Sequence, residues 1–216
     1  MAKSNYEITK EKMQTHFLSF DQERMIRQFD LRHDDDYLYL RFIGRMYRIG
    51  RRNGKVWWEQ AVPCTDGGLQ EVSCVEADFN EAMSIYDVLC CSKDGCRLSG
   101  RFARINSMKG TVHSSGLGDM LYTGAAEKFD GRAGLLRSAC ERLGGIRESV
   151  GDVAYRLPTF DFLPVIVQFW ESDEEFPASF QILWDENVLD FMHYETTYYT
   201  AGHLLARLEE IMKEHG

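Results

Sequence analysis

Residues 165–184 read VIVQFWESDEEFPASFQILW, two apolar and aromatic segments on either side of a short acidic stretch. Runs of Val, Ile, Phe and Trp of this length are typical of buried strands. The stretch between Glu171 and Pro177 is charged and ends in proline, as turns often do. The sequence therefore predicts two strands, over residues 162–170 and 179–185, joined by an acidic turn.

Short strands also dominate residues 29–59. The segments 29–33, 37–42, 45–49 and 55–59 are aromatic and partly alternate between apolar and polar residues. Asn53-Gly54 is a strong hairpin signal because both residue types tolerate a positive φ. We expect an antiparallel meander here, and a further strand over residues 153–157.

Several segments have the caps and the spacing of helices. Ser4 with Glu7 matches a capping box, as does Asp78 with Glu81, and Asp21 can cap a short helix. The predicted helices cover about residues 4–17, 21–28, 78–90, 130–143 and 196–214. Residues 60–77 and 97–118 are predicted to be loops because glycine, proline or serine is frequent there.

Strands in two groups, with helices before, between and after them, indicate an α+β fold. We expect a single domain over residues 1–216, with largely antiparallel strands and packed helices. The last helix is amphipathic, with apolar residues on one face at Leu204, Leu205, Leu208, Ile211 and Met212. A chain of 216 residues with 44% hydrophobic residues can bury a core. No run of 18 apolar residues occurs, so no membrane partner is expected.

Charge is segregated along the chain. Residues 37–58, the Arg block, contain no acidic residue but have six basic ones, namely Arg41, Arg45, Arg48, Arg51, Arg52 and Lys55. Residues 157–206 contain no Lys or Arg, while the acidic turn, Glu171–Glu175, lies among them. We expect the two blocks to be neighbours, because the guanidinium group pairs well with carboxylates. The alternative is two independent solvated faces. The net charge of −9 argues against a nucleic-acid partner.

The acidic turn is the main candidate for a functional site. Four carboxylates within five residues should repel one another unless a cation neutralises them. Either the Arg block or a hard metal ion such as Mg²⁺, Ca²⁺ or Mn²⁺ would relieve that repulsion. The flanking residues Trp170, Phe176 and Phe180 suggest that the turn folds against an aromatic surface. A hydrated structural loop is the alternative. The predicted ligand-binding residues are Arg41, Arg45, Trp170, Asp173, Glu174, Glu175 and Asp185, and no metal ligand is assigned.

Common catalytic and cofactor motifs are missing from the sequence. No phosphate-binding P-loop, Gly-x-Ser-x-Gly or His-Glu-x-x-His pattern occurs, and Gly116-Leu-Gly118 lacks the context of a dinucleotide fingerprint. His193, Glu195 and His203 fit no standard metal spacing. The six cysteines are expected to be reduced thiols, with Cys90 in the core. Basic neighbours could lower the pKa of the Cys91 and Cys96 thiols.

Several segments together resemble one known family. They are Arg41-Phe-Ile-Gly-Arg-Met-Tyr47, Leu98-Ser-Gly100-x-Phe102, Leu143-Gly-Gly145, Gly151-Asp152, Phe162-Leu-Pro164, Trp170-x-x-Asp-Glu-Glu-Phe-Pro177 and Ile182-Leu-Trp-Asp185. Over nearly its whole length the chain is similar to the family of domain of unknown function 3786. The resemblance implies a soluble cytoplasmic protein of anaerobic bacteria and archaea without an established activity. Some relatives carry an N-terminal iron–sulfur cysteine motif, which this chain lacks.

Two classes of function remain open at this point. The first is a binding or accessory module whose charged, aromatic-rimmed cleft holds a small anionic ligand, a cofactor or a partner protein. The second is an enzyme that uses the clustered carboxylates for acid–base chemistry on an anionic substrate. We favour the binding module because no nucleophile–base pair or metal template is visible, and we expect it to be cytoplasmic. No particular cofactor is implied.

Overall fold

The computed structural model describes residues 3–62, 71–108 and 117–214. Its strands form one sheet in the order β5-β4-β3-β2-β8-β9-β10-β6, with β1 beside β2 and β7 beside β8, and every strand pair is antiparallel. The strands are β1 (Arg32–His33), β2 (Tyr37–Phe42), β3 (Arg45–Gly50), β4 (Val56–Val62), β5 (Glu71–Glu76), β6 (Phe102–Arg104), β7 (Ile146–Arg147), β8 (Val153–Phe160), β9 (Leu163–Trp170) and β10 (Ser179–Asp185). The predicted α+β class is confirmed.

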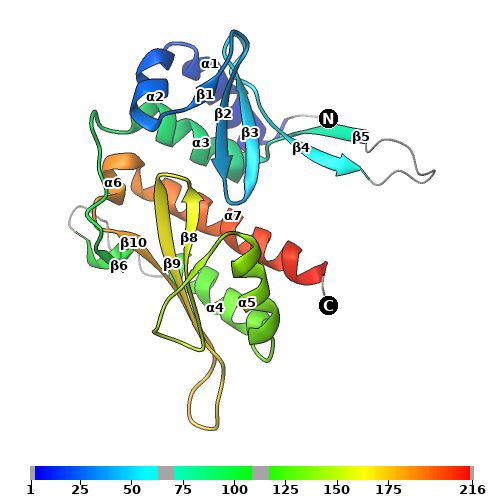
Figure 1. The fold of residues 1–216 in the computed structure, drawn as a ribbon, viewed down its shortest axis with the longest axis vertical. Helices are drawn as coiled ribbons and strands as arrows, with labels where there is room; N and C mark the ends of the chain where they lie inside the picture. Colours follow the sequence, from blue (N-terminus) through cyan, green and yellow to red (C-terminus); the bar gives the residue numbers. More distant parts are fainter. Residues whose placement is uncertain (1–2, 63–70, 109–116, 215–216) are drawn as a thin grey trace.

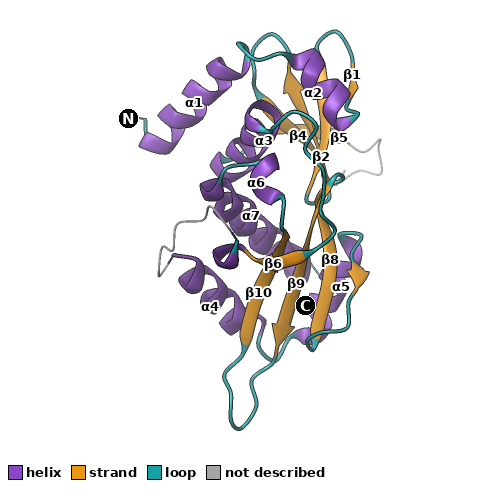
Figure 2. Ribbon diagram, turned by 90° about the vertical axis from the view of Figure 1, so that its left-hand side faces the viewer, coloured by secondary structure: helices purple, strands orange, loops and turns teal. Residues whose placement is uncertain are grey.

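The helices lie mainly on one side of this sheet (Figures 1 and 2). They are α1 (Asn5–Phe17), α2 (Gln22–Phe29), α3 (Phe79–Cys91), α4 (Leu117–Phe129), α5 (Ala133–Arg142), α6 (Val188–Phe191) and α7 (Tyr194–Lys213), and a short 3-10 turn, η1, covers Ile105–Ser107. The C-terminal helix α7 packs against α3 in one half of the molecule and against α4 and α5 in the other. It therefore connects the two groups of strands.

The two groups of strands meet at a narrow joint. Strands β2 and β8 share a single residue pair, Phe42 opposite Phe160, whose rings stack with centroids 4.5 Å apart. The backbone N–H of Ile43 donates to the carbonyl of Thr159 at 2.7 Å beside that pair. Because so few backbone hydrogen bonds join the halves, side-chain packing across the joint has to hold them together.

The predicted caps are present at three helix starts. Ser4 and Glu7 form the capping box of α1, Asp78 and Glu81 form that of α3, and Asp21 accepts from the backbone N–H of Arg24 at the start of α2. Each of these side chains satisfies a backbone donor that the first helical turn leaves unpaired. These three helix starts were therefore predictable from local sequence.

The Asn53-Gly54 turn connects β3 and β4 as predicted. Gly54 has φ of +68°, and a Cβ added there would come within 2.2 Å of the backbone oxygen of Gln14. Gln14 in turn donates from its side-chain amide to the carbonyl of Asn53. The glycine is therefore required twice, by the turn itself and by the close approach of α1.

Several boundaries differ from the sequence-based expectations. Part of the predicted loop 60–77 belongs to a hairpin, because β4 continues to Val62 and β5 begins at Glu71. Residues 97–118 were expected to be a loop, yet β6, η1 and the start of α4 lie there. The strand predicted from residue 29 starts only at Arg32. The helix predicted from residue 130 starts only at Ala133 as α5, and the carboxylate of Asp130 accepts hydrogen bonds from the backbone N–H and the hydroxyl group of Ser172.

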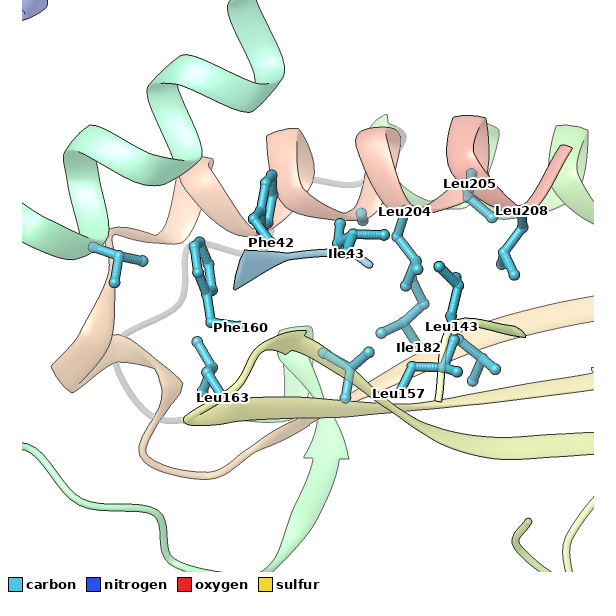
Figure 3. Packing of buried hydrophobic residues seen from close by; sticks show 14 of the residues in the cluster. Phe42, Ile43, Leu143, Leu157, Phe160, Leu163, Ile182, Leu204, Leu205 and Leu208 are labelled. Atoms are coloured by element: carbon cyan, nitrogen blue, oxygen red, sulfur yellow. The ribbon is translucent and has the colours of Figure 1, made fainter. Parts of the chain in front are cut away.

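The hydrophobic core fills the space between the sheet and α7. Figure 3 shows Leu204, Leu205 and Leu208 of α7 facing Ile43, Leu143, Leu157 and Ile182, which come from both groups of strands and from the end of α5. All of these side chains are buried. The predicted apolar face of the last helix therefore packs in the core, as its spacing indicated.

We predict that Leu208→Ala lowers the free energy of unfolding by about 2–5 kcal/mol, because the side chain is fully buried and its removal leaves a cavity. Urea unfolding followed by circular dichroism measures this loss. Ile146→Ala provides the control, since Ile146 is 66% exposed and should change stability by less than about 0.5 kcal/mol. Equal losses in the two variants would contradict the packing described for α7.

Candidate functional site

The structure places the two predicted arginines on opposite faces of the sheet. Arg41 is exposed on β2, and its Nε lies 3.8 Å from a carboxylate oxygen of Asp161 in the β8–β9 turn. Arg45 on β3 points to the helical side, where its terminal nitrogens lie 3.4 Å from Glu81 and 2.7 Å from Glu210. The guanidinium carbon of Arg45 also sits 3.7 Å from the ring centre of Trp58. Arg45 is thus mostly enclosed and already paired.

Arg45 belongs to a buried group of polar side chains, the Glu81 cluster, made up of Arg45, Tyr47, Glu81 and His203. The Tyr47 hydroxyl donates to Glu81 Oε1 at 2.6 Å, and His203 Nε2 lies 3.6 Å from the same oxygen. The other oxygen of Glu81 accepts from the backbone N–H of Asp78 at 2.7 Å. The cluster therefore joins β3, α3 and α7 through one carboxylate.

Burial sets the titration behaviour of this cluster. It lowers the pKa of His203 to about 3, and the charges of Arg45 and Arg207 act in the same direction. Burial also raises the pKa of Glu81, against the opposing effect of its hydrogen bonds from Tyr47 and Asp78. The pKa of Tyr47 is raised by burial and by the neighbouring carboxylate. At neutral pH, Tyr47 is a hydrogen-bond donor and His203 is uncharged.

The acidic turn lies far from the Arg block. It connects β9 and β10 at the lower tip of the molecule, whereas the β2–β3 hairpin is in the upper half (Figures 1 and 2). Among the described residues, no Lys or Arg lies within ion-pair distance of Asp173, Glu174 or Glu175. The expected pairing of the two blocks is therefore wrong.

The turn is organised by its own backbone. Asp173 Oδ1 accepts from the backbone N–H groups of Glu175 and Phe176 at 2.8 and 2.7 Å. Glu174 and Glu175 are exposed, and Phe176 is 66% exposed. The expected folding of the turn against an aromatic surface is wrong for Phe176. The carboxylates instead reduce their repulsion by pointing into water.

Asp185 has a structural environment at the end of β10. It is fully buried, and its carboxylate accepts from the backbone N–H groups of Ser99, Gly100 and Asn187 at 2.8–2.9 Å. Three donors of this kind satisfy a buried carboxylate well. Asp185 therefore anchors the segment that leads into β6.

Trp170 is the predicted residue that does line a cleft. This cleft, of about 430 Å³, is lined by residues of α4, β10 and the β6–η1 segment together with Trp170 at the end of β9. Its lining residues are Arg104, Ile105, Asn106, Tyr122, Thr123, Ala126, Trp170, Ala178, Ser179, Phe180, Gln181 and Ile182. Among the residues that the structure describes, this lining includes aromatic side chains and one arginine but no carboxylate. We call this space the Trp170 cleft.

Hydrogen-bond donors are concentrated on one wall of the Trp170 cleft. Arg104 is exposed, and its Nε donates to Gln181 Oε1 at 2.6 Å, which orients the guanidinium group. The side-chain oxygen of Asn106 accepts from the Tyr194 hydroxyl at 2.7 Å, so its amide nitrogen remains as the donor. Within the described chain, no carboxylate lies within ion-pair distance of Arg104. This wall is suited to a ligand that accepts hydrogen bonds.

Sequence reasoning missed Arg104, Asn106 and Tyr122. All three lie in or next to the segment that was interpreted as irregular, and no spacing rule links them to Trp170. They meet only because β6 pairs with β10 and α4 packs beside β10. Their residue types alone carried no signal of a shared site.

The described cysteines are free thiols, as predicted for Cys74, Cys90, Cys91, Cys96 and Cys140. The expectation of a lowered thiol pKa is wrong. Burial raises the pKa of Cys91 to about 11, and Asp87 adds to the effect; burial likewise raises the pKa of Cys96. Cys64, the sixth cysteine, and Gly116 lie outside the described residues.

In the described parts of the chain, two groups of side chains have donor atoms close enough to share a metal ion. One is Asp78, Glu81 and His203, and the other is Asp87, Cys91 and His193. The first group shares Glu81 and His203 with the Glu81 cluster, where Arg45 already supplies a positive charge. The second group joins His193 to Asp87 and Cys91, which are four residues apart on α3. In the sequence, His193 had instead been considered together with Glu195 and His203.

The fold and the Trp170 cleft describe an α+β protein built on one antiparallel sheet with its helices mainly on one side. Residues 21–207 match the family described as domain of unknown function (DUF3786), and the chain belongs to that family. This membership confirms the resemblance seen in the sequence. No curated protein and no solved structure matches the chain. None of the helices in the described ranges is long and apolar enough to cross a membrane.

The neutral state of His203 makes stability depend on pH. The unfolded chain protonates this residue below about pH 6.5, whereas the folded state does so only near pH 3. Its contribution to stability is complete above pH 6.5 and is lost as the pH falls. The contribution of Glu81 to stability depends on pH in the opposite direction. Its raised pKa favours folding at low pH, and that contribution is lost as the pH rises.

We predict that His203→Gln removes the histidine part of this dependence. The difference in unfolding free energy between native protein and variant should shrink by about 1.4 kcal/mol per pH unit between pH 6 and 4. Urea unfolding at several pH values measures it. Thr200→Val, a buried and non-titrating change on the same helix, should give a constant difference. A constant difference for His203→Gln as well would refute the assignment.

Proposed function

We propose that this protein is a binding module that holds a small anionic ligand with a flat ring in the Trp170 cleft. The observation that carries the proposal is the composition of the lining. In a chain of net charge −9, the described residues around this cleft include an arginine and no acid. A cleft of about 430 Å³ is in the size range of small-molecule sites.

The two walls would recognise different parts of such a ligand. Arg104 and the Asn106 amide would donate hydrogen bonds to a carboxylate or phosphate, and the planar guanidinium group suits either. Trp170 and Tyr122, both half-buried, offer ring surface to a flat group. Phe180 is buried behind Tyr122, with ring centroids 6.3 Å apart, and supports that surface.

The alternative of an acid–base enzyme has less support. Such a reaction requires a titratable group in contact with the substrate. The described lining of the Trp170 cleft has no carboxylate or histidine, and Asp185 is occupied by backbone donors. Glu81 has a raised pKa beside Arg45, but its side chain is only 4% exposed. We therefore propose that Glu81 and Arg45 stabilise the fold and do not contact a substrate.

We also propose that the protein works in a reducing compartment, such as the cytoplasm. The exposed thiols of Cys74 and Cys91 support this proposal, because exposed free cysteines are readily oxidised elsewhere. The same location would suit a module that binds a soluble metabolite.

We predict that the cleft binds the charged member of matched ligand pairs. Isothermal titration would compare benzoate with benzamide and adenosine monophosphate with adenosine, with the tryptophan fluorescence recorded in parallel. Arg104→Gln should weaken binding of the anions about tenfold or more, since a hydrogen bond to a charged group contributes about 1.5–3 kcal/mol. Binding of the neutral compounds should change little.

Arg101→Gln is the matched control. Arg101 is also exposed and lies three residues earlier, but it pairs with Glu186 and does not line the cleft. The affinity of the Arg101→Gln variant for the anions should equal that of the native protein. The proposal fails if no anion in the panel binds, or if the two arginine variants behave alike.

A further inference from the structure

A compact group of three potential metal ligands lies where the end of α3 meets the start of α7. Asp87 and Cys91 are one turn apart on α3, so their side chains share a face of that helix. His193 is the residue immediately before α7. One donor atom from each side chain lies within 4.8 Å of the other two. This Asp87 site is separate from the Trp170 cleft, since none of its residues lines that space.

The carboxylate of Asp87 is the buried and fixed part of the site. Asp87 is 9% exposed; its Oδ2 accepts from the backbone N–H of His193 at 2.7 Å, and its Oδ1 lies 2.6 Å from His193 Nδ1. The Cys91 thiol also hydrogen-bonds to this carboxylate. All three side chains are therefore held around one point by contacts between α3 and the segment before α7.

From this geometry we propose that Asp87, Cys91 and His193 bind a zinc ion whose fourth coordination position faces solvent. Thiolate sulfur, imidazole nitrogen and carboxylate oxygen are the ligand types that zinc takes in proteins. Magnesium and calcium prefer oxygen ligands alone, so the cysteine and histidine select against them. Catalytic and ligand-binding zinc sites commonly have three protein ligands, as here.

The exposed side chains of Cys91 and His193 would let the ion enter from solvent, and they leave its fourth coordination position open to solvent. Cys91 is exposed, and the His193 side chain is 64% exposed, so both can adjust around an ion while Asp87 stays fixed. The fourth position would take water or an anionic oxygen ligand. This arrangement differs from that of Asp78, Glu81 and His203, where two of the three residues, Glu81 and His203, are buried and Arg45 opposes a cation.

Charge balance also favours the ion. Zinc replaces the thiol proton of Cys91, which passes to the buffer, and the proton between His193 Nδ1 and Asp87 Oδ1 moves to His193 Nε2 by exchange with solvent, so that Nδ1 is free to ligate. No electron is transferred. Thiolate, carboxylate and Zn²⁺ then sum to zero. Two basic residues near this end of α3 are already paired, Arg24 with Asp94 and Lys93 with Asp190.

The test uses Co²⁺ as a spectroscopic substitute for zinc, with the full chain freed of metal by a chelator and kept reduced by a phosphine. We expect one Co²⁺ per chain, a thiolate-to-cobalt charge-transfer band in the near ultraviolet, and displacement by Zn²⁺. Cys91→Ser should abolish the band. His193→Gln should weaken Co²⁺ binding at least about tenfold. Both residues are exposed, and circular dichroism would verify that the variants are folded.

Cys74→Ser is the control, because Cys74 is an exposed thiol on β5 that belongs to neither ligand group. Its cobalt spectrum should match that of the native protein. The proposal is overturned if the native protein shows no thiolate band, if the band survives in Cys91→Ser, or if Cys74→Ser loses it equally. The anion titrations that test the Trp170 cleft do not depend on this result.

Discussion

The carboxylate of Glu81 is the interaction on which the arrangement of the molecule depends. The Glu81 side chain completes the capping box of α3 and accepts a hydrogen bond from the hydroxyl group of Tyr47 on β3. It also lies beside His203 of α7 and the guanidinium group of Arg45. Burying a carboxylate costs several kcal/mol unless partners of this kind surround it. Because the partners come from different elements, the charge is tolerated only when β3, α3 and α7 are correctly assembled. The cluster therefore ties formation of the core to one relative position of sheet and helices.

That constraint matters because the sheet itself is weakly continuous. A single residue pair joins β2 to β8, and the stacked rings of Phe42 and Phe160 lie at this joint. The His203 ring also stacks on Phe42, with centroids 5.1 Å apart. Helix α7 then carries the connection into the second half, where it packs on α4 and α5. Both proposed binding sites depend on this arrangement: α4 forms a wall of the Trp170 cleft, and the start of α7 supplies His193.

The segregation of charge along the chain had a different outcome from the expected one. Arg41, Arg45 and Arg48 each pair with a nearby acid, and those acids come from several segments, namely Asp161, Glu81 with Glu210, and Glu59. The acidic turn instead extends into water, which screens repulsion between exposed carboxylates. Two blocks of opposite charge need not meet when each finds local partners or solvent. Composition along the chain could not distinguish these outcomes, because the distances that decide them are set by the strand order.

Local sequence determined the class of fold and most of its parts. The capping residues Ser4, Asp21 and Asp78, the Asn53-Gly54 turn and the apolar face of the last helix act within a few residues, so their effect could be read directly. The order of the strands, the pairing of β6 with β10, and the meeting of Arg104 with Trp170 or of Cys91 with His193 were decided only by the tertiary structure. These contacts join segments up to about a hundred residues apart, and no local spacing encodes them. The predicted Trp170 lines a cleft and Arg45 lies in the buried cluster, but the partners of both were set by packing between elements that the sequence alone does not place.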